Sequence, residues 1–148
     1  MPVIVIGADT EFGAAVVSAL SGRPGDIRAF VTDPGAVGPL RALGARVAVG
    51  DITDPGHLAG AAHACFTAVL IAGAAGDERP GRQGSDPDPV LRIWAEAVAA
   101  AGVRRAIWVG SMPAAGPRPE EFALVVPGGR PPAEVAAEVA ELDDRHRL

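Results

Sequence analysis

The feature that most constrains the fold is the start of the chain, where an apolar segment runs through a glycine turn into a helix. Val3–Ile6 is a run of four β-branched residues, which is typical of a strand buried on both faces of a sheet. Gly7 interrupts the run, and Gly13 follows where apolar residues begin to recur at helical spacing. Amides at a helix N-terminus converge there, and the helix dipole favours negative charge. The segment therefore predicts a strand–turn–helix unit that can hold the pyrophosphate of a dinucleotide.

The rest of the chain alternates predicted strands with predicted helices. Further strands are expected at Ile27–Val31, Arg46–Val49, 67–72 and Arg105–Val109, with a possible short strand at 122–126. Helical patterns cover residues 37–43, 55–64, 90–101 and 132–147, and residues 73–89 form a polar, glycine- and proline-rich surface loop. This alternation predicts one α/β domain over residues 1–148, a three-layer αβα doubly wound parallel sheet of order 3-2-1-4-5, the Rossmann architecture.

Ligands of such sheets bind beyond the carboxyl ends of the strands. Five segments therefore become candidates together. They are residues 7–13, Thr32 with Asp33, Asp51 with Ile52, Ala72 with Gly73, and Gly110 with Ser111.

Composition narrows the classes of function. The net charge of −5 argues against nucleic-acid binding, and no apolar run is long enough to span a membrane. The start lacks the basic leader of a signal peptide and Cys65 is the single cysteine, so we expect a cytoplasmic protein. The three histidines show no metal-ligand spacing with Cys65, so no metal site is expected. All 13 basic residues are arginine and tyrosine is absent, which excludes a Tyr–Lys acid pair, a lysine Schiff base and a P-loop lysine within this chain.

Four motifs together resemble a known family. They are Gly-Ala-x-x-x-x-Gly from Gly7, Val-x-Asp-Pro from Val31, Gly-Ala-x-Val-x-x-Gly-Asp-x-Thr-Asp from Gly44, and Val-Gly-Ser from Val109. Over about residues 3–112 the chain resembles the atypical short-chain dehydrogenase/reductases of the NmrA-like, NAD(P)H-binding type, which include the biliverdin/flavin reductases. The resemblance implies that the cofactor is NAD or NADP.

The resemblance also implies roles for individual residues. Those around the pyrophosphate would be Gly7, Ala8, Thr10, Glu11, Phe12 and Gly13. Asp51 would accept from the adenine amino group, with the Ile52 amide beside the ring. Ala72 and Gly73 would line the ribose-nicotinamide channel, and Ser111, the one catalytic candidate, would lie near the nicotinamide.

Two departures from the family pattern leave alternatives open. Thr10 stands in place of a glycine, so its hydroxyl either donates to a phosphate or crowds it. Relatives that prefer NADP often carry an arginine at the position of Thr32, whereas here Asp33 is adjacent and a 2′-phosphate has no partner unless Arg28 or another arginine folds in.

We expect an oxidoreductase that transfers hydride to a small planar acceptor, a flavin or a quinone, whose proton comes from water. The alternative is a non-catalytic NAD(P)-sensing regulator, or a subunit whose partner supplies the family's substrate-binding cap, which this sequence does not contain. A decayed relative that binds nothing is a third reading. The open edge of the sheet favours a homodimer.

Overall fold

The chain folds around a parallel sheet whose order matches the prediction. The structure is a computed structural model, and it describes residues 2–23, 25–76 and 86–148. Its strands run in the order β3-β2-β1-β4-β5-β6, and every neighbouring pair is parallel. They are β1 (Val3–Ile6), β2 (Ile27–Val31), β3 (Arg46–Val49), β4 (Thr67–Ile71), β5 (Arg105–Val109) and β6 (Glu121–Val125). The predicted order 3-2-1-4-5 is confirmed, and the possible strand near residue 122 extends the sheet as β6.

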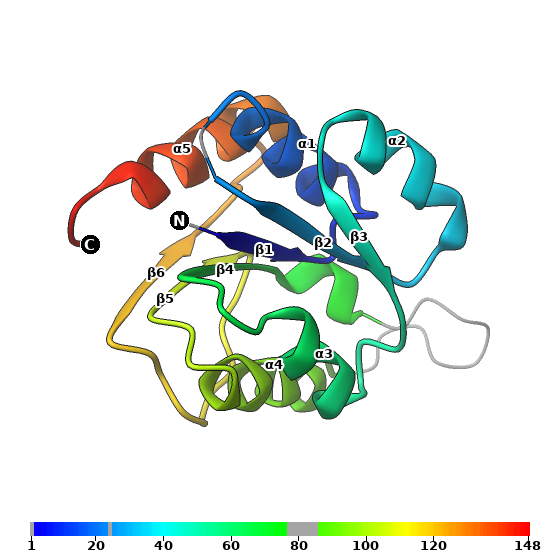
Figure 1. Ribbon diagram of the computed structural model, residues 1–148. Coiled ribbons are helices and arrows are strands. Elements are labelled where there is room, and N and C mark those ends of the chain that lie inside the picture. Colours follow the sequence, from blue (N-terminus) through cyan, green and yellow to red (C-terminus); the bar gives the residue numbers. More distant parts are fainter. Residues whose placement is uncertain (1, 24, 77–85) are drawn as a thin grey trace.

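Helices cover both faces of the sheet. They are α1 (Glu11–Leu20), α2 (Val37–Ala42), α3 (Pro55–Ala61), α4 (Asp88–Ala100) and α5 (Pro132–Asp144), with two 3₁₀ turns, η1 (Pro34–Ala36) and η2 (Ala72–Ala75). One core lies between the sheet and α1, α2 and α5, and a second lies between the sheet and α3 and α4 (Figure 1). β1 contributes to both: Val3 and Val5 join the first core, Ile4 and Ile6 the second. This explains why its sequence is apolar at every position rather than at alternate ones.

Several boundaries differ from the predicted ones. α1 begins at Glu11 rather than at Gly13, because Thr10 caps it. α4 begins at Asp88 rather than at residue 90. The predicted loop 73–89 opens instead with η2, and its residues 77–85 lie outside the described part of the chain. α3 ends at Ala61, and Ala64 then takes a left-handed conformation with φ +63°.

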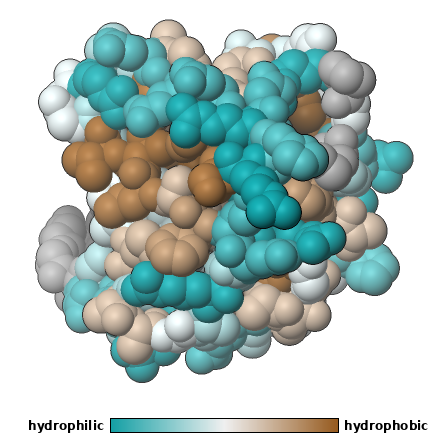
Figure 2. All heavy atoms as spheres, turned by 90° about the vertical axis from the view of Figure 1, so that its left-hand side faces the viewer, coloured by the Kyte–Doolittle hydropathy of each residue, from teal (hydrophilic) through white to brown (hydrophobic). Residues whose placement is uncertain are grey.

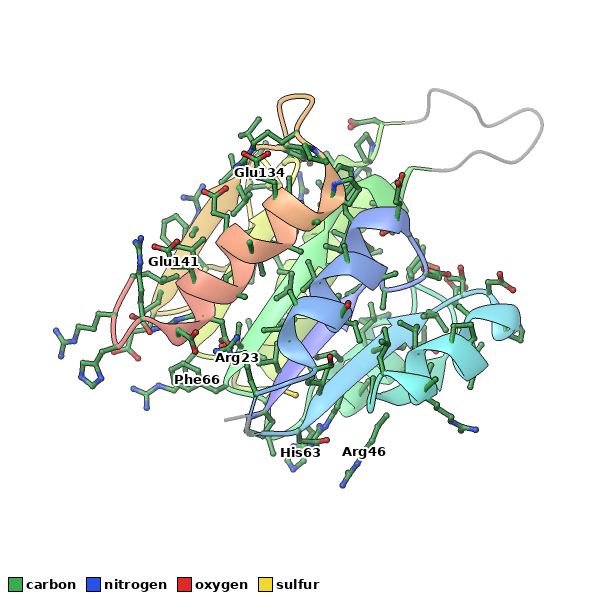
Figure 3. All side chains as sticks on the ribbon, turned by 90° about the horizontal axis from the view of Figure 1, so that it is seen from above. Arg23, Arg46, His63, Phe66, Glu134 and Glu141 are labelled. Atoms are coloured by element: carbon green, nitrogen blue, oxygen red, sulfur yellow. The ribbon has the colours of Figure 1, made fainter. Side chains whose placement is uncertain are left out.

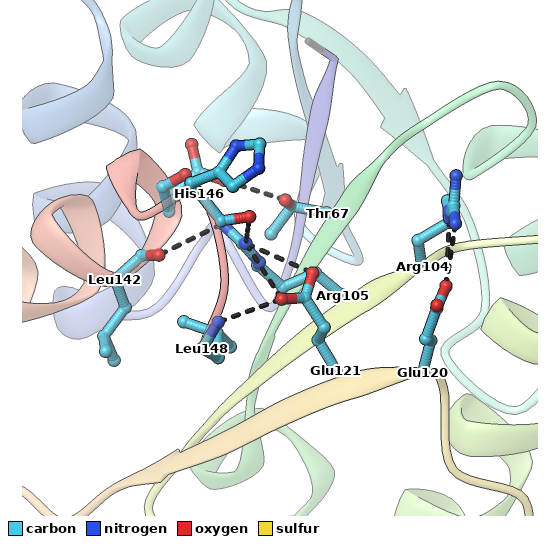
Figure 4. Close-up of polar contacts among 9 residues, drawn as sticks. Thr67, Arg104, Arg105, Glu120, Glu121, Leu142, His146 and Leu148 are labelled. Carbon is cyan, nitrogen blue, oxygen red and sulfur yellow. Dashed lines mark hydrogen bonds and ion pairs between the residues drawn. The ribbon is translucent and has the colours of Figure 1, made fainter.

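The end of α5 is fixed by a buried arginine at the amino-terminal edge of the sheet (Figure 4). Arg105 is 1% exposed and its guanidinium donates to the carbonyls of Leu142, Asp143 and His146. The same guanidinium pairs with Glu121, at 3.2 Å. Because these carbonyls are held by Arg105, the helix predicted to reach residue 147 ends at Asp144.

β6 leaves an apolar stripe on the surface. Phe122, Leu124 and Val126 alternate along it and are 42%, 45% and 59% exposed. The side chains between them turn the other way, and Val125 is buried in the core beneath α5. Figure 2 looks at this side of the molecule and shows brown, apolar surface there. β6 is also the outermost strand, so its outer backbone groups have no neighbouring strand among the described residues. Elsewhere in the described part of the chain, no helix has the length and apolarity needed to cross a bilayer.

Candidate functional site

The carboxyl ends of the strands meet at one edge of the sheet because the strands pair in parallel register. Ile6 pairs with both Phe30 and Leu70, and Leu70 pairs with Trp108. The segments that follow these strands therefore lie side by side, as the sequence predicted. Figure 3 shows the opposite edge well: Arg23, Arg46, His63 and Phe66 gather there, away from Glu134 at the start of α5.

Two glycines let the first turn pack closely. Gly7 has φ +87°, and a Cβ at this position would lie 2.8 Å from Cβ of Ala74 in η2. A Cβ on Gly13 would lie only 2.1 Å from the carbonyl oxygen of Gly7. A side chain at either position would therefore push β1, α1 and η2 apart. The geometry is that of a tight strand–turn–helix unit, with the N-terminus of α1 directly above the end of β1.

Thr10 uses its hydroxyl within this turn. Its Oγ1 accepts from the Gly13 amide at 3.0 Å and donates to the Gly7 carbonyl at 2.7 Å. The residue has extended backbone angles and is the N-cap of α1. The hydroxyl proton therefore points at the Gly7 carbonyl. In this arrangement the Thr10 side chain does not donate to a phosphate, which was one of the two roles that the sequence left open.

The remaining first-turn amides fit an anion. The Gly13 amide donates to the Thr10 hydroxyl that caps the helix. The amides of Glu11 and Phe12 belong to the same turn and have no carbonyl partner within the helix. They stand at the positive end of the α1 dipole, the arrangement that holds a pyrophosphate. Ala8 is fully buried and its amide donates to the carbonyl of Phe30, so this residue packs the turn against β2.

A carboxylate that sequence reasoning missed lies at the end of β2. Asp9 Oδ2 accepts from the Thr32 amide at 3.0 Å, from the Thr32 hydroxyl at 3.0 Å and from the Asp33 amide at 3.2 Å. Asp33 turns its own carboxylate to the Gly35 amide and caps η1. Nothing in the sequence pairs position 9 with positions 32 and 33, because the contact depends on how β1 and β2 pair.

Arg28 does not approach Thr32. Its guanidinium pairs with Asp26 and donates to the carbonyls of Ala61 and His63. Those groups lie at the amino-terminal edge, where His63 is seen in Figure 3. The hypothesis that Arg28 folds in to hold a 2′-phosphate is not supported by this arrangement.

The loop after β3 is shaped by two aspartates and a tryptophan. Asp54 caps α3 by accepting from the His57 amide at 3.2 Å. Asp51 is also engaged, since its Oδ1 accepts from the amide and hydroxyl of Thr53 at 2.8 and 2.6 Å. The family resemblance implied a contact of Asp51 with adenine, and sequence reasoning missed this turn. The buried indole of Trp94 donates to the carbonyl of Ile52 at 2.9 Å and fixes the loop from below.

The ends of β4 and β5 complete the edge. Ala72 is buried and opens η2, while Gly73 is exposed beside it. β5 and η2 are in contact, and a Cβ on Gly110 would lie 3.5 Å from Cβ of Ala72. Ser111 follows on this exposed rim. Its hydroxyl has no histidine or carboxylate partner among the described residues, so it can orient a ligand but is not activated as a nucleophile.

Other groups with reactive potential lie elsewhere. Burial raises the pKa of the Cys65 thiol, so this cysteine is protonated near neutral pH and packs as an apolar residue. Within residues 2–23, 25–76 and 86–148, no three His, Cys, Asp or Glu side chains are grouped as metal ligands are. A polar cavity of about 320 Å³ lies between Val3, Arg23 and His146, at the amino-terminal edge. The strand-end rule for doubly wound sheets places a ligand at the other edge.

Comparison with known protein families settles what kind of domain this is. The family model described as NAD(P)H-binding matches residues 7–144, which is most of the chain and includes every strand end described above. The chain belongs to this family. A comparison with curated proteins found no match.

Solved structures share the fold. The NADPH-dependent quinone oxidoreductase of Escherichia coli, solved with NADPH, is 26% identical, with a TM-score of 0.58 over 72% of this chain and 36% of its own. The Citrobacter sp. triphenylmethane reductase complexed with NADP(H) is 23% identical, with a TM-score of 0.62 over 74% of this chain and 37% of its own. An anaerobillin reductase from Escherichia coli O157:H7 is 18% identical, with a TM-score of 0.69 over 100% of this chain and 93% of its own. The NAD(P)H-binding chain thus spans about a third of the quinone and triphenylmethane enzymes but nearly the whole of the third protein.

Proposed function

We propose that this NAD(P)H-binding protein is a reductase that transfers hydride from NADH or NADPH to a small planar acceptor, a flavin or a quinone. The observation that carries the proposal is the glycine turn of β1 and α1 set beside the ends of β4 and β5, within an NAD(P)H-binding family match. The 26% identical relative is a quinone oxidoreductase by name, which supports the choice of acceptor class.

The chain's own contribution would be binding and orientation. The Glu11 and Phe12 amides would hold the pyrophosphate, and the loop of Asp51 and Ile52 would hold the adenine. The Ala72–Gly73 segment would line the channel to the nicotinamide, with the Ser111 hydroxyl at its rim. A reduced nicotinamide supplies the hydride when bound.

The residues that the chain lacks support this acceptor class. With no tyrosine or lysine, the chain has no Tyr–Lys pair to protonate a carbonyl during hydride transfer. A quinone or flavin that gains a hydride can take its balancing proton from water, so no such acid is needed. The reaction then consumes one reduced cofactor, one acceptor and one proton, and it releases the oxidised cofactor and the reduced acceptor.

The test combines binding with turnover. NADH and NADPH are titrated calorimetrically, and their oxidation by a flavin and by a soluble quinone is then followed by nicotinamide absorbance. We expect the chain to bind at least one of the two cofactors and to oxidise it. Ser111→Ala should lower the rate of cofactor oxidation about tenfold, and Ser111→Thr should retain most of that rate. Ser18→Ala, an exposed serine in the last turns of α1, is the matched control. No binding of either cofactor would overturn the proposal.

A non-catalytic NAD(P)-sensing regulator is the second candidate. The absence of an activating partner for Ser111 among the described residues and the inward-turned Thr10 hydroxyl favour it. Cofactor binding without oxidation by either acceptor would select the regulator over the reductase.

A further inference from the structure

We propose that Asp9, held at the end of β2, makes this site select NADH over NADPH. The inference rests on the proposed cofactor binding and adds to it the choice between the two dinucleotides. It concerns a residue that belongs to the glycine turn but contacts the neighbouring strand.

Asp9 occupies a cluster of hydrogen-bond donors at the end of β2. Three donors at the end of β2 converge on a single oxygen, Asp9 Oδ2: the Thr32 amide, the Thr32 hydroxyl and the Asp33 amide, all within 3.2 Å. Clustered amide and hydroxyl donors of this kind are what a phosphate oxygen needs. In this chain they are already satisfied by an internal carboxylate, so an incoming anion would have to displace it.

This donor cluster lies at the position that meets the adenosine ribose in doubly wound domains. In doubly wound domains the residue near the end of the second strand, about 20 residues after the glycine turn, contacts the adenosine ribose. An acidic residue there accepts from the 2′-hydroxyl of NAD, whereas an arginine accommodates the 2′-phosphate of NADP. Asp33 occupies this position, and Asp9 is bonded to its amide. The ribose end of the site therefore carries two carboxylates.

Among the described residues, no cation offsets the charge of these two carboxylates. Arg23, Arg28 and Arg46 are paired with carboxylates at the amino-terminal edge, two of them visible there in Figure 3. Arg41 lies in the last turn of α2, where the chain returns to the start of β3. The other described arginines belong to α4, to the turn before β5, to β5 or to the chain beyond it. A neutral 2′-hydroxyl can donate to a carboxylate, but a 2′-phosphate presents oxygens and negative charge to it.

The binding experiment compares the two cofactors on the intact chain. Dissociation constants of NADH and NADPH are measured by calorimetry for the wild type and for Asp9→Asn. We expect the wild type to bind NADH about tenfold or more tightly than NADPH. Asparagine keeps an acceptor oxygen for the Thr32 and Asp33 amides while removing the charge, so Asp9→Asn is expected to tighten NADPH about fivefold or more and to leave NADH within about twofold. Glu96→Gln, which removes the same charge from an exposed position on α4, should leave the ratio unchanged.

A second measurement needs no variant. Repulsion between the carboxylates and a 2′-phosphate is screened by salt, so the NADH-to-NADPH preference of the wild type should shrink between low salt and about 0.5 M salt. Equal or tighter binding of NADPH by the wild type overturns the proposal, as does an NADH preference that neither Asp9→Asn nor salt reduces. Failure of both cofactors to bind instead overturns the proposed function, so the two failures are distinguishable.

Discussion

Removing the Thr10 hydroxyl should destabilise the first helix by a measurable amount. Thr10→Ala loses the bond from the Gly13 amide at 3.0 Å and the bond to the Gly7 carbonyl at 2.7 Å. Loss of an N-cap side chain costs about 1 kcal/mol, and the second bond is worth about as much. Because both bonds share one hydroxyl, we expect the free energy of unfolding to fall by about 1 to 2 kcal/mol. For a domain of this size the melting temperature would fall by about 3 to 6 °C.

The assay is urea denaturation followed by circular dichroism, with melting curves alongside. Thr10→Ser keeps the hydroxyl and should stay within about 0.5 kcal/mol of the wild type. Thr10→Gly should cost only a few tenths of a kcal/mol for the cap, in addition to about 1 kcal/mol for the lost bond to the Gly7 carbonyl. An alanine variant as stable as the wild type would refute the capping role.

The same variants test the binding role of Thr10. Because the hydroxyl is directed at Gly7, it is not expected to be a phosphate ligand, and Thr10→Gly should bind the cofactor at least as well as the wild type. A glycine variant that folds normally but binds about tenfold more weakly would show that the hydroxyl contacts phosphate instead.

Three further predictions concern packing, pH and association. Gly13→Ala should lower the free energy of unfolding by about 2 kcal/mol or more, because the added Cβ would lie 2.1 Å from the Gly7 carbonyl oxygen. The control Gly60→Ala places its Cβ in open space on α3, so it should raise the free energy of unfolding slightly in the same denaturation assay. The Leu148 amide, and after it the charge of Arg105, lower the pKa of Glu121. The stability that this group contributes is present above the ordinary pKa of 4.5 and is lost as the pH falls through the lowered pKa. The free energy of unfolding should therefore decline less on the acid side in Glu121→Gln than in the control Glu120→Gln. The exposed apolar stripe on β6 is the surface through which we expect the chain to form a homodimer. Light scattering should show a dimer that Leu124→Lys dissociates and that Ala19→Lys leaves intact. A wild type that is monomeric at about tens of micromolar would contradict this prediction.

Much of the fold was predictable because its signals are local. Four β-branched residues, a glycine turn and a cap-like Thr-Asp-Pro are each read within a few neighbouring positions, and they placed β1, α1 and α3 within a few residues of their observed starts. The end of α5 was not predictable, since it is set by Arg105, about 40 residues away in the sequence. The same holds for the start of α4, where the Asp88 carboxylate also accepts from the amide of Ala114.

The candidate site divides in the same way. The strand-end segments around Gly7, Asp51, Ala72 and Ser111 were expected at one edge, since parallel strands bring their carboxyl ends together. The sequence did not show which polar groups of these segments already hydrogen-bond to one another. Asp51 is bonded to Thr53 and Asp9 to Thr32, and both are short side chains whose partners depend on angstrom-scale placement of the backbone.

The sequence by itself determined that this is an alternating parallel αβα domain with a glycine turn at its first strand end, because hydrophobic periodicity and backbone permissiveness are properties of short segments. Only the tertiary structure decided that Thr10 caps α1 from within that turn and that the Asp9 carboxylate occupies the donors at the end of β2. Thr10 bonds groups only three residues away within the turn, so there the structure selects between roles that the sequence left open. The Asp9 contact joins groups 23 residues apart, and the pairing of β1 with β2 brings these groups within reach.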